Sequence, residues 1–358
     1  MNTDKEQQNE SRYLITVELS ADETDTAIKE GVPLFLERVQ SMPLEEGEDL
    51  YSGLERRFGE ERSGRALADA VINYVLPKAL GQIGLEPACS PVPLQERTPE
   101  AGKPYSFQAR VYVLPIAELS DYETPVEVSV KRTYTTEDEI DQQLMALAVH
   151  FATEEKSELT GNEVRSVPTI DDEWVATVYP LPDINTVHDL RAQVRNRLDQ
   201  MKEEEFENQK VNAAVAALSE RLGDADIDEI VQIVGKDMIA NIEEEIIANE
   251  GKILDVALKE QKIKREDFDR AMFERARDSV REGMTMDAVF RHENMEVTDE
   301  DLEDAIQRIT SGAESPEQAL EAQVSLREQG RSPELVQVAR RLKAGKWIGD
   351  HARVTVEV

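Results

Sequence analysis

The sequence predicts an α+β N-terminal domain followed by a mostly α-helical, elongated C-terminal domain that bears arms. Two patterns carry this prediction. Strand-like alternation of apolar and polar residues recurs in the first third of the chain, and apolar residues at three- and four-residue spacing run from residue 186 onward. The length of 358 residues suits two or three domains. Because aromatic residues make up only 5% and charged residues 32%, we expect aliphatic cores and long solvated helix faces.

The N-terminal domain is expected at residues 12–124, behind a polar tail at residues 1–11 that we expect to be disordered. Alternation predicts its strands, and capping residues and proline positions predict where its helices begin and bend. The expected elements are, in order, a strand at 13–19, a helix at 22–40 with a kink or break at residues 31–33, a loop at 41–53, a helix at 63–84 bent at Pro77, and a hairpin of the strand-like segments 86–96 and 105–114.

The C-terminal domain is expected at residues 125–358. Its longest helix, from residue 186 to Leu222, would span roughly 50 Å at about 1.5 Å per residue, a length that suggests an arm. The next apolar stripe, residues 227–246, could pack antiparallel on it. The other expected elements are a strand at 126–130, a helix from the capping box Thr136/Glu139 to Phe151, a connector with little regular structure at 152–185, a helix at 265–281, helices begun by Thr298, Ser315 and Ser332, and a strand at 351–358.

The formal net charge of −34 argues against several partners. Such a chain repels phosphate backbones, so we expect no nucleic-acid binding through its general surface. The acidity is consistent with a salt-tolerant surface, or with a negative rim that keeps a protein–client complex soluble. No run of about eighteen apolar residues occurs, so no membrane partner is expected. The polar N-terminus lacks the features of a signal peptide, and the cytoplasm is the expected compartment.

The residue types that carry chemistry are sparse and scattered. Histidines 150, 188, 292 and 351 are too far apart in sequence for a local zinc site, and consecutive acidic residues on a helix cannot converge on calcium. Cys89 has no histidine near it in sequence, which favours a buried structural thiol over a nucleophile. No phosphate-binding loop or serine-hydrolase elbow is present. We therefore expect no catalytic residues, no metal, no cofactor and no enzyme activity.

Flexible methionines cluster with aromatic and aliphatic residues in the C-terminal half. Methionine suits surfaces that accept many partners, although a plain helical core is the favoured explanation for each individual residue. If some of these side chains stay exposed, they could bind apolar segments of other proteins. The candidate contact residues are Ile242, Ile246, Met272, Phe273, Met284, Met286, Val289 and Phe290.

Several segments resemble bacterial trigger factor. The turn at Leu85-Glu86-Pro87 follows a helix and precedes a hairpin, and the exit reads Pro-x-x-Glu-Leu-x-Asp-Tyr at residues 115–122. Together the similar segments touch more than a third of the chain in the family's order. The resemblance implies a ribosome-binding α+β domain and a helical domain with two arms that cradles unfolded chains. The segments are 16–30, 54–61, 75–92, 106–128 and 168–198.

Two departures from the family change what the resemblance implies. Family members carry Gly-Phe-Arg-x-Gly-Lys-x-Pro at a ribosome-docking tip, whereas residues 42–50 here replace its basic residues with acids. Because RNA repels such a tip, ribosome docking is doubtful. The family also inserts a prolyl-isomerase domain of about 90–100 residues, a usual domain size. Only residues 152–167 stand in its place, so we expect no isomerase activity.

We therefore expect an ATP-independent holdase that binds unfolded or nascent polypeptides and assists their folding. A dedicated scaffold or assembly factor for one partner protein is the alternative, and its terminal strand at 351–358 could then add to a partner's sheet. A homodimer is left open by the sequence. A broad client range would favour the first hypothesis, and a single stoichiometric partner the second.

Overall fold

The computed structural model describes residues 1–40, 44–45, 47–94, 97–156, 163–178, 184–312, 315–329 and 332–357. The chain forms two compact units. The first unit contains residues 1–122 and 218–344, and the second contains residues 123–217 and 345–358. The first unit thus joins the N-terminal α+β region to most of the C-terminal helices. The domain limits at 12–124 and 125–358 stay a prediction.

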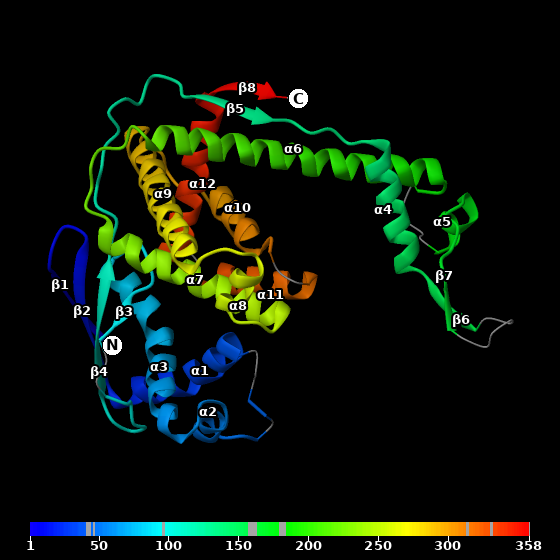
Figure 1. The fold of residues 1–358 in the computed structure, drawn as a ribbon. Coiled ribbons are helices and arrows are strands. Elements are labelled where there is room, and N and C mark those ends of the chain that lie inside the picture. The colour runs from blue at the N-terminus through cyan, green and yellow to red at the C-terminus, as the bar shows by residue number, and fades with distance from the viewer. Residues whose placement is uncertain are drawn as a thin grey trace. The chain divides into compact units, whose positions relative to one another are not determined.

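The secondary structure follows the predicted order, with strands mainly early and helices late (Figure 1). The first unit contains β1 (Asn2–Gln7), β2 (Arg12–Leu19), α1 (Ala21–Gln40), α2 (Leu50–Phe58), α3 (Glu60–Ile83), β3 (Val92–Pro93), β4 (Tyr105–Tyr112), α7 (Asp228–Glu250), α8 (Leu254–Glu260), α9 (Arg265–His292), α10 (Asp299–Thr310), α11 (Pro316–Gln329) and most of α12 (Pro333–His351). The second unit contains β5 (Glu127–Lys131), α4 (Glu137–His150), β6 (Thr153–Lys156), β7 (Glu163–Ser166), α5 (Asp172–Val178), most of α6 (Val187–Ser219) and β8 (Arg353–Glu357).

The strands of the first unit form an antiparallel sheet in the order β1-β2-β4-β3. The expectation that residues 1–11 are disordered is wrong, because β1 pairs with β2 from Asn2 opposite Glu18 to Gln7 opposite Tyr13. As an edge strand, β1 is held by backbone hydrogen bonds while most of its side chains face solvent. Its polar composition therefore resembled that of a disordered tail.

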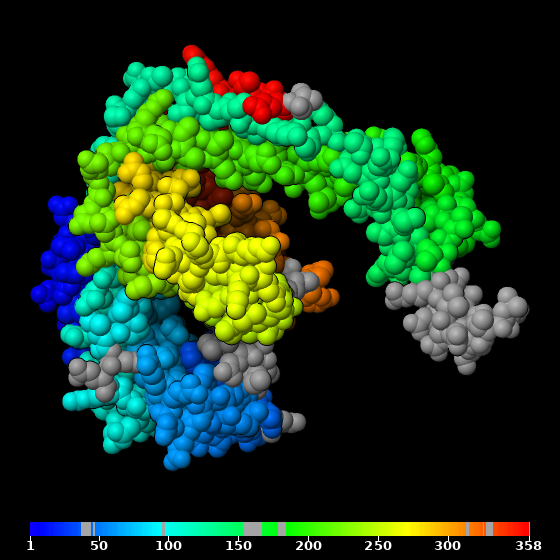
Figure 2. All heavy atoms as spheres, in the orientation of Figure 1, coloured from blue at the N-terminus to red at the C-terminus, as the bar shows by residue number. Residues whose placement is uncertain are grey.

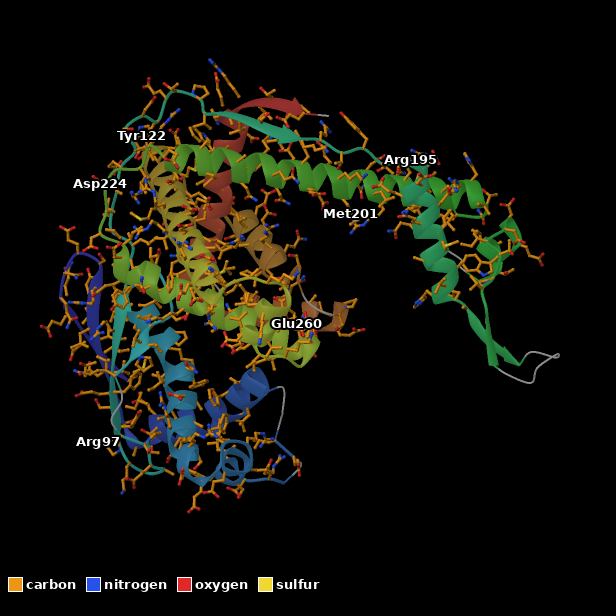
Figure 3. All side chains as sticks on the ribbon, in the orientation of Figure 1. Arg97, Tyr122, Arg195, Met201, Asp224 and Glu260 are labelled. Carbon is orange, nitrogen blue, oxygen red and sulfur yellow. The ribbon has the colours of Figure 1, made fainter. Side chains whose placement is uncertain are left out.

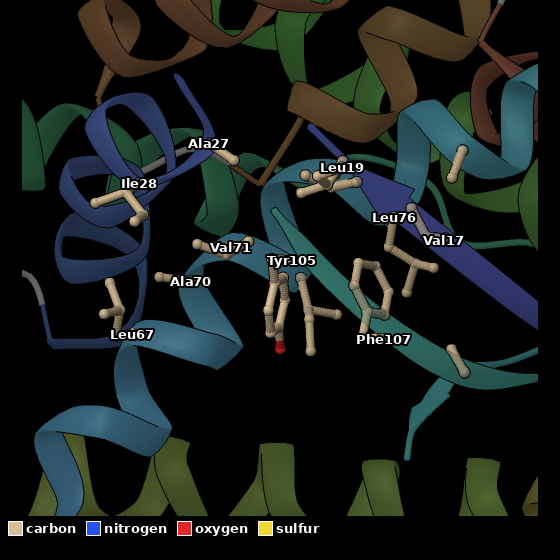
Figure 4. Packing of buried hydrophobic residues seen from close by; sticks show 14 of the residues in the cluster. Val17, Leu19, Ala27, Ile28, Leu67, Ala70, Val71, Leu76, Tyr105 and Phe107 are labelled. Atoms are coloured by element: carbon tan, nitrogen blue, oxygen red, sulfur yellow. The ribbon is translucent and has the colours of Figure 1, made fainter. Parts of the chain in front are cut away.

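Helices α1 and α3 cover this sheet and share its core, in which Val17 and Phe107 meet Ile28 and Val71 (Figure 4). Of the predicted kink or break at residues 31–33, the break is wrong, since α1 continues through Pro33, and the kink stays a prediction. A side chain at Gly31 would lie 2.9 Å from the Ala70 carbonyl oxygen. Gly31 therefore allows α1 to approach α3 closely, which is a packing role rather than a helix-breaking one.

Helix α7 packs along α9 within the first unit. The close approach depends on Gly235, where a Cβ atom would lie 2.3 Å from the Phe273 ring. The predicted packing of residues 227–246 on the long helix before them stays a prediction. Helix α9 runs on to His292, well past its predicted end at Arg281. The predicted capping at Thr298 is confirmed, because its side chain accepts a hydrogen bond from the backbone N–H of Asp301 and the Asp301 carboxylate accepts one in return.

Polar contacts fasten the N-terminal segment of the first unit to its helical segment. Arg340 of α12 donates to Asp287 of α9 at 2.9 Å and to Glu86 at 2.8 Å, and Arg341 reaches the other Asp287 oxygen at 3.0 Å. The ring of Tyr122 stacks on His292 with centroids 3.9 Å apart. These contacts explain why segments far apart in the sequence form one unit.

In the second unit, a small core joins α4, α5 and the beginning of α6. It contains Ile140 and Trp174, and Phe151 packs edge-on against the Trp174 ring. The prediction that residues 152–185 form a connector with little regular structure is wrong in part, because the described residues there include the β6–β7 hairpin and α5. Residues 157–162 and 179–183 lie outside the described part of the chain.

The predicted terminal strand is confirmed as β8, which pairs in parallel with β5 of its own unit. None of the helices in the described part of the chain combines the length and apolar character that crossing a bilayer requires. Among the same residues, no group of three histidine, cysteine or acidic side chains is arranged to hold a metal ion.

Candidate functional site

Exposed aliphatic side chains gather where α7 ends, α8 forms and α9 begins. Ile247, Ile253, Val256 and Ile263 expose 48%, 56%, 42% and 42% of their surface. We call these four residues the α8 surface. Figure 2 shows the α8 segment in yellow-green on the outside of the first unit, and Figure 3 marks its last residue, Glu260. Most aliphatic residues of a soluble protein are buried, so four exposed ones within seventeen residues mark a candidate binding surface.

Local structure explains why Ile253 and Val256 are exposed. Gly251 ends α7 in the left-handed conformation, with φ of 65°, and the chain turns there into the short helix α8. Only one side of α8 faces the protein, and Leu254, Ala257 and Leu258 fill it. Because Ile253 and Val256 lie outside that side, they face solvent.

Two basic side chains beside the α8 surface are paired with acidic ones. Lys252 donates a hydrogen bond to Glu260 at 2.7 Å, and this bond raises the pKa of the lysine. Arg265 binds Asp255 at 2.7 Å, which likewise raises the pKa of Arg265. Some of the charges beside the exposed aliphatic groups are therefore neutralised by their partners, and paired charges oppose the approach of an apolar partner less than unpaired ones.

The predicted contact residues divide into two groups. Met284 and Val289 expose only 2% and 1% of their surface, so they belong to the interior of the first unit. The half-buried residues lie on α7 and α9, where Phe273 also fills the space beside Gly235. The half-buried candidates are Ile242, Ile246, Met272, Phe273, Met286 and Phe290.

Sequence reasoning missed the α8 surface. Its candidates lie at residues 242–246 and 272–290, and the aliphatic residues between these two groups were not considered. The available signal was Gly251, a residue type that commonly ends a helix, with the apolar pairs Ile246-Ile247 and Ile253-Leu254 close to it on either side.

The acidic tip between α1 and α2 folds back on α2. Glu48 accepts a bidentate pair of hydrogen bonds from Arg56, at 2.7 and 2.9 Å, which lower its pKa to about 2. Glu45 also binds Arg56, at 3.0 Å, and Arg57 reaches Glu48 at 3.4 Å. The nearest basic side chains are therefore occupied by carboxylates. Met42, Pro43 and Glu46 of the predicted tip lie outside the described residues.

Cys89 does not extend the search for chemistry. Burial, together with the charge of Asp237, raises the pKa of its thiol to about 12. The thiol therefore stays protonated at neutral pH and lacks the nucleophilic thiolate form.

Comparison with known proteins decides the family. The model described as "Bacterial trigger factor protein (TF)" matches residues 1–147, and the one described as "Bacterial trigger factor protein (TF) C-terminus" matches residues 186–350. The chain belongs to the trigger factor family. Only residues 148–185 and 351–358 fall outside the two matches. Membership supports a chaperone role for the chain.

Individual trigger factors are distant relatives. That of Anoxybacillus flavithermus is 23% identical over 83% of this chain and 88% of its own length, and that of Bacillus licheniformis is 21% identical over 87% and 92%. That of Mycobacterium ulcerans is 30% identical over 48% and 34%. A solved structure, titled "Promiscuous Substrate Recognition in Folding and Assembly Activities of the Trigger Factor Chaperone", is 14% identical with a TM-score of 0.35 over 98% of this chain and 99% of that chain.

The alignment to the Anoxybacillus trigger factor also shows a difference in length. The alignment has 389 positions. It includes 83% of the 358 residues of this chain, which is about 297 residues, so about 90 positions of the alignment contain no residue of this chain. The trigger factor relative is therefore longer than this chain within the matched region.

Proposed function

We propose that this trigger factor family member is an ATP-independent cytoplasmic holdase that binds unfolded or nascent polypeptides without isomerase activity. The α8 surface is the observation that carries the proposal. Four aliphatic side chains are 42–56% exposed there, in a chain whose net charge of −34 would keep a bound complex soluble. An unfolded polypeptide is the partner that presents apolar segments of many sequences to such a surface.

The strength of binding follows from the area available. Complete burial of a Val or Ile side chain is worth about 1.5–3 kcal/mol, and these residues are already about half buried, so each has roughly 1 kcal/mol left to contribute. Four such contacts barely offset the freedom lost on association. We therefore expect weak, reversible binding that relies on several segments of one client.

The absence of isomerase activity is supported by the space between the family matches. Residues 148–185 separate them, and their described part holds the end of α4, the β6–β7 hairpin and α5. About 90 aligned positions of the Anoxybacillus relative have no counterpart here, which is close to the size of the inserted isomerase domain. A protease-coupled assay on a prolyl tetrapeptide tests this, with no acceleration above the uncatalysed rate expected.

The acidic tip between α1 and α2 supports the proposal that the chain docks weakly or not at all on the ribosome. Contact with RNA phosphates needs free basic groups, and here Arg56 is engaged by both Glu45 and Glu48. Co-sedimentation with ribosomes at low salt tests the proposal. Recovery of the protein in the ribosome pellet would overturn it.

Client binding is tested by removing the α8 surface. The change is Ile253→Ser with Ile263→Ser, and the matched control is Leu94→Ser with Ile116→Ser, two exposed aliphatic residues elsewhere in the first unit. Fluorescence anisotropy of a labelled, permanently unfolded polypeptide, without nucleotide, measures affinity. We expect at least about fivefold weaker binding for the α8 variant, since about 1 kcal/mol changes affinity roughly fivefold, and little change for the control. Equal affinities would show that clients bind elsewhere.

A further inference from the structure

The second unit contains a two-stranded parallel sheet whose outer edge is open. Over the five residues of β8, this strand pairs in parallel with β5 (Figure 1). The N–H of Arg353 donates to the carbonyl of Val126 at 2.8 Å, so residue 353 bonds to β5. Because the backbone groups of successive residues in a strand point to opposite sides, residues 355 and 357 also bond to β5, and the N–H and C=O groups of residues 354 and 356 point away from it.

These outward groups of Val354 and Val356 have no hydrogen-bond partner in the part of the chain that the structure describes. An unpaired edge is a template for another strand, and a two-stranded sheet is marginal by itself. Val356 is 45% exposed, although Val130, opposite it on β5, is 4% exposed. The apolar face of the sheet is therefore buried on β5 and open on β8, and a further strand would continue it.

Backbone chemistry and charge together select the occupant of this edge. A strand that adds here needs free N–H and C=O groups along several residues. Folded proteins satisfy or protect such groups, whereas an unfolded polypeptide exposes them along its whole length. A second copy of this chain is disfavoured, because each copy carries a net charge of −34. β8 itself carries one basic and one acidic side chain, Arg353 and Glu357, so it does not repel a neutral segment.

We propose that β8 binds an extended segment of an unfolded client polypeptide, which adds to the sheet as a third, antiparallel strand. Because the occupant is a client, this site rests on the proposed holdase function, and it differs in chemistry from the α8 surface. Two client residues each exchange a pair of backbone hydrogen bonds, one with Val354 and one with Val356. Their side chains lie on the valine face of the sheet, so the preferred clients have apolar residues at every second position.

Recognition through the backbone explains how one edge can serve many sequences. Side chains set only the preference for alternation, whereas the hydrogen bonds require N–H groups that every residue except proline supplies. The contact is small, since four hydrogen bonds and two valines act against the freedom lost on association. We therefore expect a Kd of roughly 0.1–1 mM for one short segment.

Fluorescence anisotropy of a labelled peptide tests the mode of binding. The peptide alternates valine with threonine and ends in lysine on both sides. N-methyl groups on its valines remove the donors that face β8 when the valines lie on the valine face, and N-methyl groups on its threonines leave those donors in place. We expect binding to weaken about tenfold or more for the first modification and less than about threefold for the second. Equal losses would contradict strand addition.

Two substitutions at one position test the site on the protein. Val356→Pro removes the outward N–H of residue 356 and no hydrogen bond to β5, and edge strands tolerate proline in that orientation. Val356→Thr keeps the N–H and the β-branched shape. We expect the proline variant to bind the peptide about tenfold or more weakly, and the threonine variant to bind within about twofold of the unmodified chain.

Hydrogen exchange shows whether β8 stays in place in these variants. The N–H of Arg132 donates to the carbonyl of Glu357 at 2.8 Å, so its slow exchange reports that β8 still pairs with β5. In the unmodified chain, the peptide should slow exchange of the Val354 and Val356 amides and leave that of Thr355, which already bonds to β5, unchanged. Exchange of Val354 and Val356 that the bound peptide does not slow would overturn the proposal.

The outcomes separate this site from the holdase function. If the unmodified chain binds an unfolded polypeptide, but Val356→Pro with β8 in place binds the peptide as well as Val356→Thr does, the edge proposal fails and the holdase function stands. If no unfolded polypeptide binds, the holdase function fails, and loss of peptide binding in Val356→Pro still supports the edge. A lower mass of the chain alone in sedimentation on Val356→Pro would assign the edge to a second copy and overturn the proposal.

Discussion

The charge cluster around Asp287 gives the sharpest prediction about stability. Its carboxylate accepts from Arg340 at 2.9 Å and from Arg341 at 3.0 Å, and Arg340 continues to Glu86. The Asp287 side chain is 11% exposed and the arginines 20% and 25%. Asp287→Asn removes the charge that both arginines face while preserving the shape of the side chain.

The size of the effect follows from this burial. Breaking a fully buried ion pair costs about 3–5 kcal/mol because one charge is left without a partner. The arginines here retain solvent contact and Glu86, so we expect the lower value of about 2–3 kcal/mol. For a unit of this size each kcal/mol corresponds to about 2–4 °C in Tm. The melting temperature of the first unit should therefore fall by about 4–12 °C.

Circular dichroism during heating measures this change, and Asp278→Asn is the matched control. Asp278 is exposed on the same helix, so its loss should change the free energy of unfolding by less than about 0.5 kcal/mol. If Asp287→Asn melts at the same temperature as Asp278→Asn, the cluster does not hold the two segments of the first unit together.

Three further predictions concern particular contacts. Gly235→Ala should destabilise by about 1–2 kcal/mol in urea unfolding, since the new Cβ meets Phe273; in a Phe273→Ala background it should stabilise instead. Hydrogen bonds from Lys202 and the Thr136 backbone lower the pKa of Glu139 to about 2. The stabilisation that ionised Glu139 provides is therefore present above pH 4.5 and is lost as the pH falls toward 2. The melting temperatures of Glu139→Gln and of the unmodified chain should therefore differ above pH 4.5 and become equal near pH 2; a difference that stays constant with pH would contradict this. Glu48→Gln should speed hydrogen exchange of the α2 backbone amides, because it removes the carboxylate that binds Arg56. Unchanged exchange would show that contacts other than the Glu48–Arg56 pair hold the segment before α2 in place.

Local signals predicted much of the fold. The capping box at Thr136 and Glu139 places the beginning of α4, and Ser315 with Pro316 places the beginning of α11, because a cap depends on residues within one turn. The long apolar repeat of α6 was likewise readable, and the helix spans 33 residues. The family resemblance was carried by similarly local motifs.

What the sequence did not reveal depends on partners far away in the chain. Strand β1 looked like a tail because its bonds are made by the backbone of β2, and the packing of α7 on α9 depends on a single glycine, Gly235. The candidate site shows the same limit. Periodicity could not tell that Met284 is buried at 2% exposure while Ile253 is 56% exposed, because that difference is set by which neighbours the fold supplies.

Suppression of aggregation tests the central claim most directly. Several unrelated proteins are diluted from denaturant into buffer without ATP, with and without this chain, and light scattering is followed. The account predicts that scattering falls for most clients at stoichiometric or modestly higher ratios, because an apolar surface of this kind does not select sequence. Undiminished scattering for every client would contradict a general holdase.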